Sequence, residues 1–126
     1  MRPRTNGEVP SDIDLAPMLG QEMLAFTVGK HHLELVFSDM RLIVQAGYEL
    51  SRLGQPLQSF SRDTFAGGAE LMPPLLSCTV KSAEWLAGKG LLITFSGGMQ
   101  FIALVDGSGY ESFSFGLPHQ PGAVVV

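Results

Sequence analysis

The chain has 126 residues, of which 45% are apolar and 16% are charged, and its formal net charge is −4. This length is typical of one domain with a single hydrophobic core, and the apolar share excludes a largely disordered chain. Only eight residues are Lys or Arg, which excludes the broad basic face that nucleic-acid binding needs. No nucleic acid is therefore expected as a partner, and a basic protein surface suits this acidic domain better.

The single cysteine, Cys78, rules out an internal disulfide and indicates a reducing compartment. Residues 1–7 lack the apolar core of a secretion signal, and no run approaches the ~18 apolar residues of a membrane span. The sequence therefore predicts a cytoplasmic protein with no membrane contact.

In chain order, residues 1–10 are polar and indicate a flexible N-terminal tail, and residues 11–126 are expected to form a single β domain. Ser11 and Asp14 are candidate caps for a short helical turn at Leu15–Leu19. Alternating apolar residues then predict four strands. These are expected at Gln21–Val28, His32–Phe37, Met40–Ala46 and Tyr48–Arg52.

Residues 53–73 carry many turn signals, and a short helix is expected to begin near Asp63 or Ala69. So long a connection in a small domain is either a linker between repeats or a functional loop. The linker is favoured, because a repeated unit needs a crossing at this point.

The second half of the chain repeats the pattern of the first. Repeat 1 covers about residues 15–52 and repeat 2 about residues 74–126, with strands expected at Cys78–Trp85, Leu91–Phe95, Met99–Val105, Tyr110–Phe115 and Ala123–Val126. The offset is 95 − 37 = 58 at two phenylalanines, 74 − 17 = 57 at two prolines and 110 − 48 = 62 at two tyrosines. A chance likeness between two β-meanders is the alternative.

These patterns predict a mainly β fold of two pseudo-repeated antiparallel meanders, forming a sandwich or a partly open barrel with one or two short helices. Each meander is expected to have about four strands. The alternation predicts a core at six positions: Leu33, Leu35, Phe37, Leu91, Ile93 and Phe95.

The residues that carry chemistry form no recognised motif. His31 and His32 are neighbours near a turn, and neighbours on a strand point to opposite faces, so one metal ion is not expected to bind both. Exposed hairpin residues are the favoured interpretation of this pair. Cys78 lies in an apolar strand and is expected to be a small buried residue. No catalytic, cofactor-binding or metal-binding residue is therefore assigned, and no cofactor is expected.

Trp85 and Tyr110 each combine an aromatic body with a polar tip, which suits an interface anchor. Core residues that close one end of a sheet are the competing interpretation, and it is favoured. Together with His31 and His32, these two residues are the candidates for contact with a partner.

The end of the chain reads Leu91, Ile93 and Phe95, a Gly98 hairpin, Asp106, then Tyr-Glu-Ser-Phe at 110–113 and three valines at 124–126. In this it resembles a family of small, uncharacterised bacterial β-rich domains that end in Tyr-Glu-Ser-aromatic. Some members look like immunity proteins, which bind and occlude a toxin. The resemblance covers residues 75–126 and, more weakly, 15–50, and it implies no catalytic residue.

The leading hypothesis is a non-enzymatic protein-binding domain, immunity-like in the sense of that resemblance. A carrier of a small ligand in an apolar barrel cavity is the first alternative, and an enzyme that uses the His31/His32 region is the second. Strands with apolar residues on both faces, as at Ile43 and Ile102, also favour a homodimer.

Overall fold

The structure is a computed structural model, and it describes residues 9–52, 55–106, 111–117 and 122–126. The mainly β prediction is confirmed, because the described residues form ten strands and three short 3-10 helices. The strands are β1 (Met23–Val28), β2 (Leu33–Phe37), β3 (Arg41–Val44), β4 (Gly47–Ser51), β5 (Gln58–Ser61), β6 (Val80–Leu86), β7 (Gly90–Phe95), β8 (Gln100–Leu104), β9 (Phe113–Phe115) and β10 (Val124–Val125).

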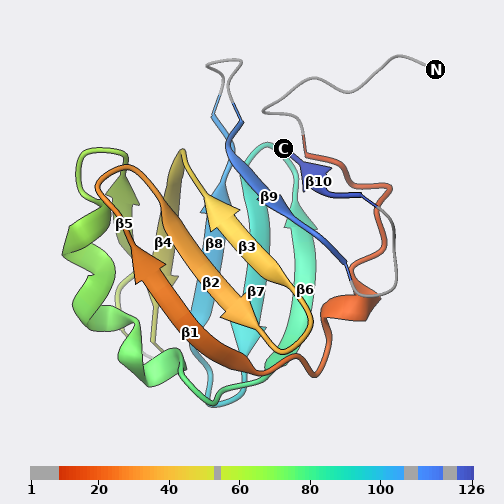
Figure 1. Cartoon of the computed structure of the whole chain (residues 1–126), viewed down its shortest axis with the longest axis horizontal. Coiled ribbons are helices and arrows are strands. Elements are labelled where there is room, and N and C mark those ends of the chain that lie inside the picture. The colour runs from red at the N-terminus through yellow and green to blue at the C-terminus, as the bar shows by residue number, and fades with distance from the viewer. Residues whose placement is uncertain (1–8, 53–54, 107–110, 118–121) are drawn as a thin grey trace.

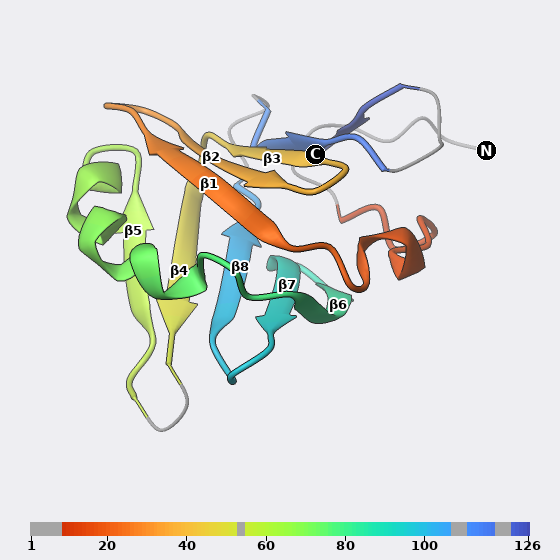
Figure 2. The ribbon, with the colours of Figure 1, turned by 60° about the horizontal axis from the view of Figure 1, so that its bottom comes forward.

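The strands form two antiparallel sheets that face each other (Figures 1 and 2). One has the order β1-β2-β3-β9-β10 and is called the front sheet, after its place in Figure 1. The other has the order β5-β4-β8-β7-β6 and is called the rear sheet. The sheets do not close into a barrel, so of the two predicted architectures the sandwich is the one observed.

The core lies between the two sheets, as the alternation predicted. All six predicted core residues are at most 2% exposed, and Leu35 and Ile93 are fully buried. Successive side chains on a strand point to opposite faces, so the residues between these six positions lie on the outer faces of the sandwich.

Each half of the chain contributes to both sheets. β1, β2 and β3 form a meander in the front sheet, and the chain then crosses to the rear sheet, where β4 and β5 form a hairpin. The second half does the reverse: β6, β7 and β8 form a meander in the rear sheet, and β9 and β10 form a hairpin in the front sheet. The two halves therefore exchange hairpins, which the sequence pattern did not predict.

The ladders of the two halves match in detail. The register shifts between Met23 and Ala25 in β1, and between Val80 and Ser82 in β6. In the segment before each shift, the backbone N–H of Glu22 donates to Ser38 Oγ, and the backbone N–H of Thr79 donates to Ser96 Oγ, both at 3.0 Å.

Glu22 and Thr79 also form an isolated antiparallel β-bridge with each other. The segment before β1 therefore pairs with the equivalent segment before β6.

Short 3-10 turns precede both meanders: η1 (Ala16–Met18), where a turn was predicted, and η3 (Pro73–Leu75). Asp14 Oδ1 accepts a hydrogen bond from the backbone N–H of Ala16 at 2.9 Å, but the cap position of η1 is taken by Leu15, so Asp14 is not the N-cap residue that was expected. After each turn one residue takes a left-handed backbone: Gly20 at φ 81° and Ser77 at φ 70°.

The ladders correct the match that the sequence suggested between Tyr48 and Tyr110. Tyr48 on β4 pairs with Ala103 on β8, and Phe113 on β9 pairs with Val44 on β3. The residue of the second half that is equivalent to Tyr48 is therefore Phe113, at an offset of 113 − 48 = 65. Tyr110 itself lies outside the described residues.

The segment expected to be a linker includes regular structure in its described part, residues 55–73. They include β5, which pairs with β4, and a 3-10 helix, η2 (Phe65–Leu71), near the predicted helix start. Among the described residues, each half therefore has five strands, one more than the four located from the sequence in the first half. In Figure 1, η2 lies at the left end of the sandwich, beside β5.

Candidate functional site

The outer face of the rear sheet carries an apolar patch formed by β6, β7 and β8. Leu92 on β7 pairs directly with Ile102 on β8, and Leu86 and Leu104 lie on either side of Gly90 in the neighbouring row. Ile102 is 6% exposed yet lies outside the core cluster, and the three leucines are half-buried. The solvent face of an antiparallel sheet is usually polar, so this patch requires an explanation. It is called the rear patch below.

A carboxylate lies beside the rear patch. Glu49 on β4 pairs with Ile102 on one side and with Ser59 on the other. Its Oε1 atom is buried, and the Nζ of Lys89, on the turn between β6 and β7, lies 2.9 Å away. The Glu49 side chain is 16% exposed and that of Lys89 is 43% exposed.

The outer face of the front sheet is built differently. Ile43 lies at its centre, between Glu34 on β2 and Ser114 on β9, and Val36 lies between Ala25 and Arg41. Apolar and polar side chains alternate there, and Arg41 Nη1 lies 4.0 Å from Glu34 Oε2. No pair like Leu92 and Ile102 joins two large apolar side chains at the described central positions of this face.

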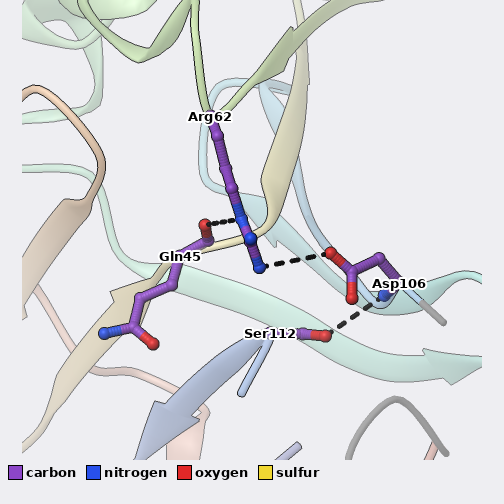
Figure 3. A network of polar contacts seen from close by, with 4 residues as sticks. All are labelled: Gln45, Arg62, Asp106 and Ser112. Carbon is purple, nitrogen blue, oxygen red and sulfur yellow. Dashed lines mark hydrogen bonds and ion pairs between the residues drawn. The ribbon is translucent and has the colours of Figure 1, made fainter. Parts of the chain in front are cut away.

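A polar network joins the two points at which the chain changes sheets (Figure 3). Arg62 donates from Nε to the Gln45 carbonyl at 3.1 Å and from Nη2 to Asp106 Oδ2 at 3.4 Å. The Asp106 backbone N–H in turn donates to Ser112 Oγ at 3.1 Å. Gln45 leads from β3 to β4, and Asp106 and Ser112 flank the crossing from β8 to β9, so this network stabilises the exchange of hairpins.

Next to this network is a shallow hollow of about 410 Å³, lined by His31, Gln45, Arg62, Asp63 and Glu111. It is the concave site that an enzyme using His31 would need. His31 Nδ1 lies 3.3 Å from the Arg62 carbonyl, and no described hydrogen bond joins this ring to Asp63 or Glu111. The hollow therefore groups His31 with the carboxylates of Asp63 and Glu111.

His32 does not line this hollow. Its exposed ring lies over Gly29, where an added Cβ would collide with it. Among the residues that the structure describes, no three His, Cys, Asp or Glu side chains are close enough together to hold a metal ion.

Trp85 lies at the opposite end of the sandwich from η2. The centre of its ring lies 6.3 Å from the ring centre of Phe113 and 6.1 Å from that of Phe115. Its Nε1 donates a hydrogen bond to the Ile13 carbonyl at 3.0 Å. The hydrogen bond to Ile13 holds the segment before η1 against β6, the edge strand of the rear sheet. These contacts agree with the interpretation of Trp85 as a residue that closes a sheet end.

Cys78 is half-buried rather than fully buried. It packs against the core cluster, and its Sγ donates to the Pro74 carbonyl at 3.3 Å.

A groove of about 410 Å³ lies between the ends of β4 and η2, with Leu50, Leu71 and Met99 among its lining residues.

No family model, curated protein or solved structure matches this chain. The resemblance to bacterial β-rich domains therefore stays a prediction. In the described part of the chain, no helix has the length and apolar character needed to cross a bilayer.

Sequence reasoning missed Glu49 and Lys89. It noted apolar residues on both faces of the strands, at Ile43 and Ile102, but it had no strand order. Glu49 lies beside Ile102 only because β4 crosses to the rear sheet, and local alternation carries no signal for that crossing.

Proposed function

We propose that this protein is a non-enzymatic protein-binding domain, and that it binds its partner through the outer face of the rear sheet. The direct pairing of Leu92 with Ile102 outside the core is the observation that carries the proposal. Protein interfaces have an apolar centre with a polar rim. Leu86 and Leu104 extend the apolar centre here. Polar groups border it: Glu84 on β6 pairs with Leu92, Glu49 pairs with Ile102, and Lys89 pairs with Glu49.

The acidic composition supports the same proposal. The net charge of −4 favours encounter with a basic surface. An immunity-like role is one form that such binding takes, and it is proposed on the sequence resemblance alone. A homodimer through the rear patch is the other form, since two copies would each cover the patch of the other.

The carrier hypothesis has less support. Its ligand was expected in an apolar cavity inside a barrel, whereas the sheets form a sandwich whose inner face is filled by buried side chains. The groove beside η2 opens at one end of the sandwich, with Arg52 and Glu70 among its lining residues.

The proposal is tested by site-specific photo-crosslinking of the full chain in the cell that produces it. A crosslinking amino acid at position 92 reports on the rear sheet, and the same amino acid at position 36 is the matched control on the front sheet. We expect one stoichiometric protein adduct from position 92 and little from position 36. Equal adducts from both positions, or none from position 92, would contradict the proposal.

An adduct between two copies of the chain identifies the homodimer form. Light scattering of the purified protein then checks the molecular mass. A variant with Leu92→Lys is expected to remove the adduct, because a charge at the centre of an apolar interface is costly to desolvate. Val36→Lys, with the same chemistry on the other face, is expected to leave it intact.

A further inference from the structure

The Glu49 carboxylate occupies an unusual position for a charged group. It lies in a central row of the rear sheet, between Ser59 and Ile102, and its Oε1 is shielded from solvent. In the part of the chain that the structure describes, this oxygen accepts no hydrogen bond, and the Nζ of Lys89, 2.9 Å away, is its ion-pair partner. Burying a carboxylate is unfavourable unless a cation or hydrogen-bond donors compensate for the lost water.

The equivalent position in the front sheet carries no charge. Leu50 pairs with Phe101 on the rear sheet and Phe115 pairs with Leu42 on the front sheet, so the residue before Leu50 corresponds to the residue before Phe115. That residue is Ser114, which pairs with Ile43 as Glu49 pairs with Ile102. A neutral side chain thus fills the equivalent place in the other sheet.

The cation that pairs with Glu49 is held loosely. The Lys89 carbonyl accepts a hydrogen bond from the backbone N–H of Val105 at 2.9 Å, which fixes the turn. The side chain is 43% exposed and reaches Glu49 through four flexible methylene groups. Its ammonium can therefore leave the carboxylate without any change in the backbone.

We propose that Glu49 receives an arginine or lysine side chain of a protein partner, which takes the place of the Lys89 ammonium. This inference rests on the proposed function and names the chemistry of its partner: a cation flanked by apolar side chains. The leucines of the rear patch contact the flanking residues, and the carboxylate selects the cation. Arginine suits the site better than lysine, because its planar guanidinium donates two parallel hydrogen bonds to a carboxylate.

The test uses a defined probe, the tripeptide acetyl-Leu-Arg-Leu-amide, and its counterpart in which neutral citrulline replaces arginine. Each is titrated into the isotope-labelled full chain, and the amide NMR signals of Glu49, Leu92 and Ile102 are followed. The protein is examined as wild type, as Lys89→Met, as Glu49→Gln and as the double variant. Circular dichroism checks that each variant is folded, and Glu49→Ser replaces Glu49→Gln if that variant is not.

We expect the arginine peptide to bind Lys89→Met at least tenfold more tightly than the citrulline peptide does, and also more tightly than it binds the wild type. The preference for arginine disappears in Glu49→Gln and in the double variant. Equal binding of the two peptides to Lys89→Met, or binding of neither, overturns the inference. The crosslinks from position 92 decide the proposed function separately, so a partner found there whose binding is unchanged by Glu49→Gln overturns the inference alone.

Discussion

The two halves of the chain adopt one architecture and differ in what they expose. At equivalent core positions the residues are alike: Leu35 matches Ile93, and Phe37 matches Phe95, all nearly or fully buried. At equivalent outer positions they diverge, as Ser114 and Glu49 show. The shared positions define the fold, and the divergent positions are where function is sought.

The turns between the first two strands of each half show the same contrast. Lys89 and His31 occupy equivalent turns, between β6 and β7 and between β1 and β2. Lys89 reaches onto the outer face of the rear sheet, whereas His31 contacts the Arg62 carbonyl beside the sheet crossing. Equivalent backbones thus present different chemistry.

The largest expected effect concerns the core. Leu35→Ala and Ile93→Ala each remove a fully buried side chain from the same place in the two meanders. Each is expected to lower the free energy of unfolding by about 2–5 kcal/mol. Urea unfolding followed by Trp85 fluorescence measures both, and a loss in one half only would break the comparison.

A second prediction concerns Gly90, where the halves differ in backbone. Gly90 has φ 151°, and a Cβ added there would collide with the Ala103 carbonyl. The equivalent residue of the first half is His32, whose backbone φ is not positive. Gly90→Ala is expected to lower the free energy of unfolding by about 2–3 kcal/mol. Gly88→Ala, at φ 71° with open space around it, is the control and is expected to cost about 1 kcal/mol. Equal costs would show that the close approach to β8 has no effect.

The sequence predicted those parts of the fold that local pattern encodes. Alternation located nine of the ten strands and the six core residues, because one buried face imposes a period of two. It missed β5, whose residues Gln58–Ser61 are mostly polar and exposed, since such an edge strand has no apolar alternation.

The exchange of hairpins and the Glu49–Lys89 pair lay beyond prediction for a different reason. Both depend on which strands become neighbours in space, and that is decided by long-range packing. The first strand illustrates the limit within one element: the register shift after Met23 turns Phe26 and Val28 towards the core. Strict alternation along a strand would place Met23 on the opposite face from those two residues.

A third prediction uses Tyr48 and its counterpart Phe113, which lacks a hydroxyl group. Tyr48 is buried, its hydroxyl donates to the Phe65 carbonyl at 2.8 Å, and burial raises the pKa of Tyr48 to about 12. The folded state therefore keeps a proton that the unfolded state loses from about pH 10, so this contribution to stability is complete below pH 10 and declines towards pH 12.

The measurement is the free energy of unfolding of wild type and Tyr48→Phe from pH 8 to pH 12. At pH 8 the variant is expected to be less stable by about 1 kcal/mol, because the Phe65 carbonyl loses its donor. The difference should shrink as the pH rises, since the variant has no proton to lose at position 48. A constant difference up to pH 12 would contradict the assignment.

The smallest expected effect is that of Glu49→Ser, which gives the rear sheet the residue found at Ser114. The free energy of unfolding is expected to change by less than about 1 kcal/mol, because a partly exposed ion pair contributes little. Thermal unfolding measures it, and Ser114→Ala provides a matched change on the front sheet. A loss comparable with that of Ile93→Ala would show that the fold needs the carboxylate.

The central claim is that the two halves exchange hairpins, and NMR measures it most directly through distances between backbone protons of paired strands. We expect nuclear Overhauser contacts that join Val44 to Phe113 and Tyr48 to Ala103, at corresponding points of the two sheets. Contacts of β4 with β3 and of β9 with β8, in place of these, would keep each half in its own sheet and contradict the account.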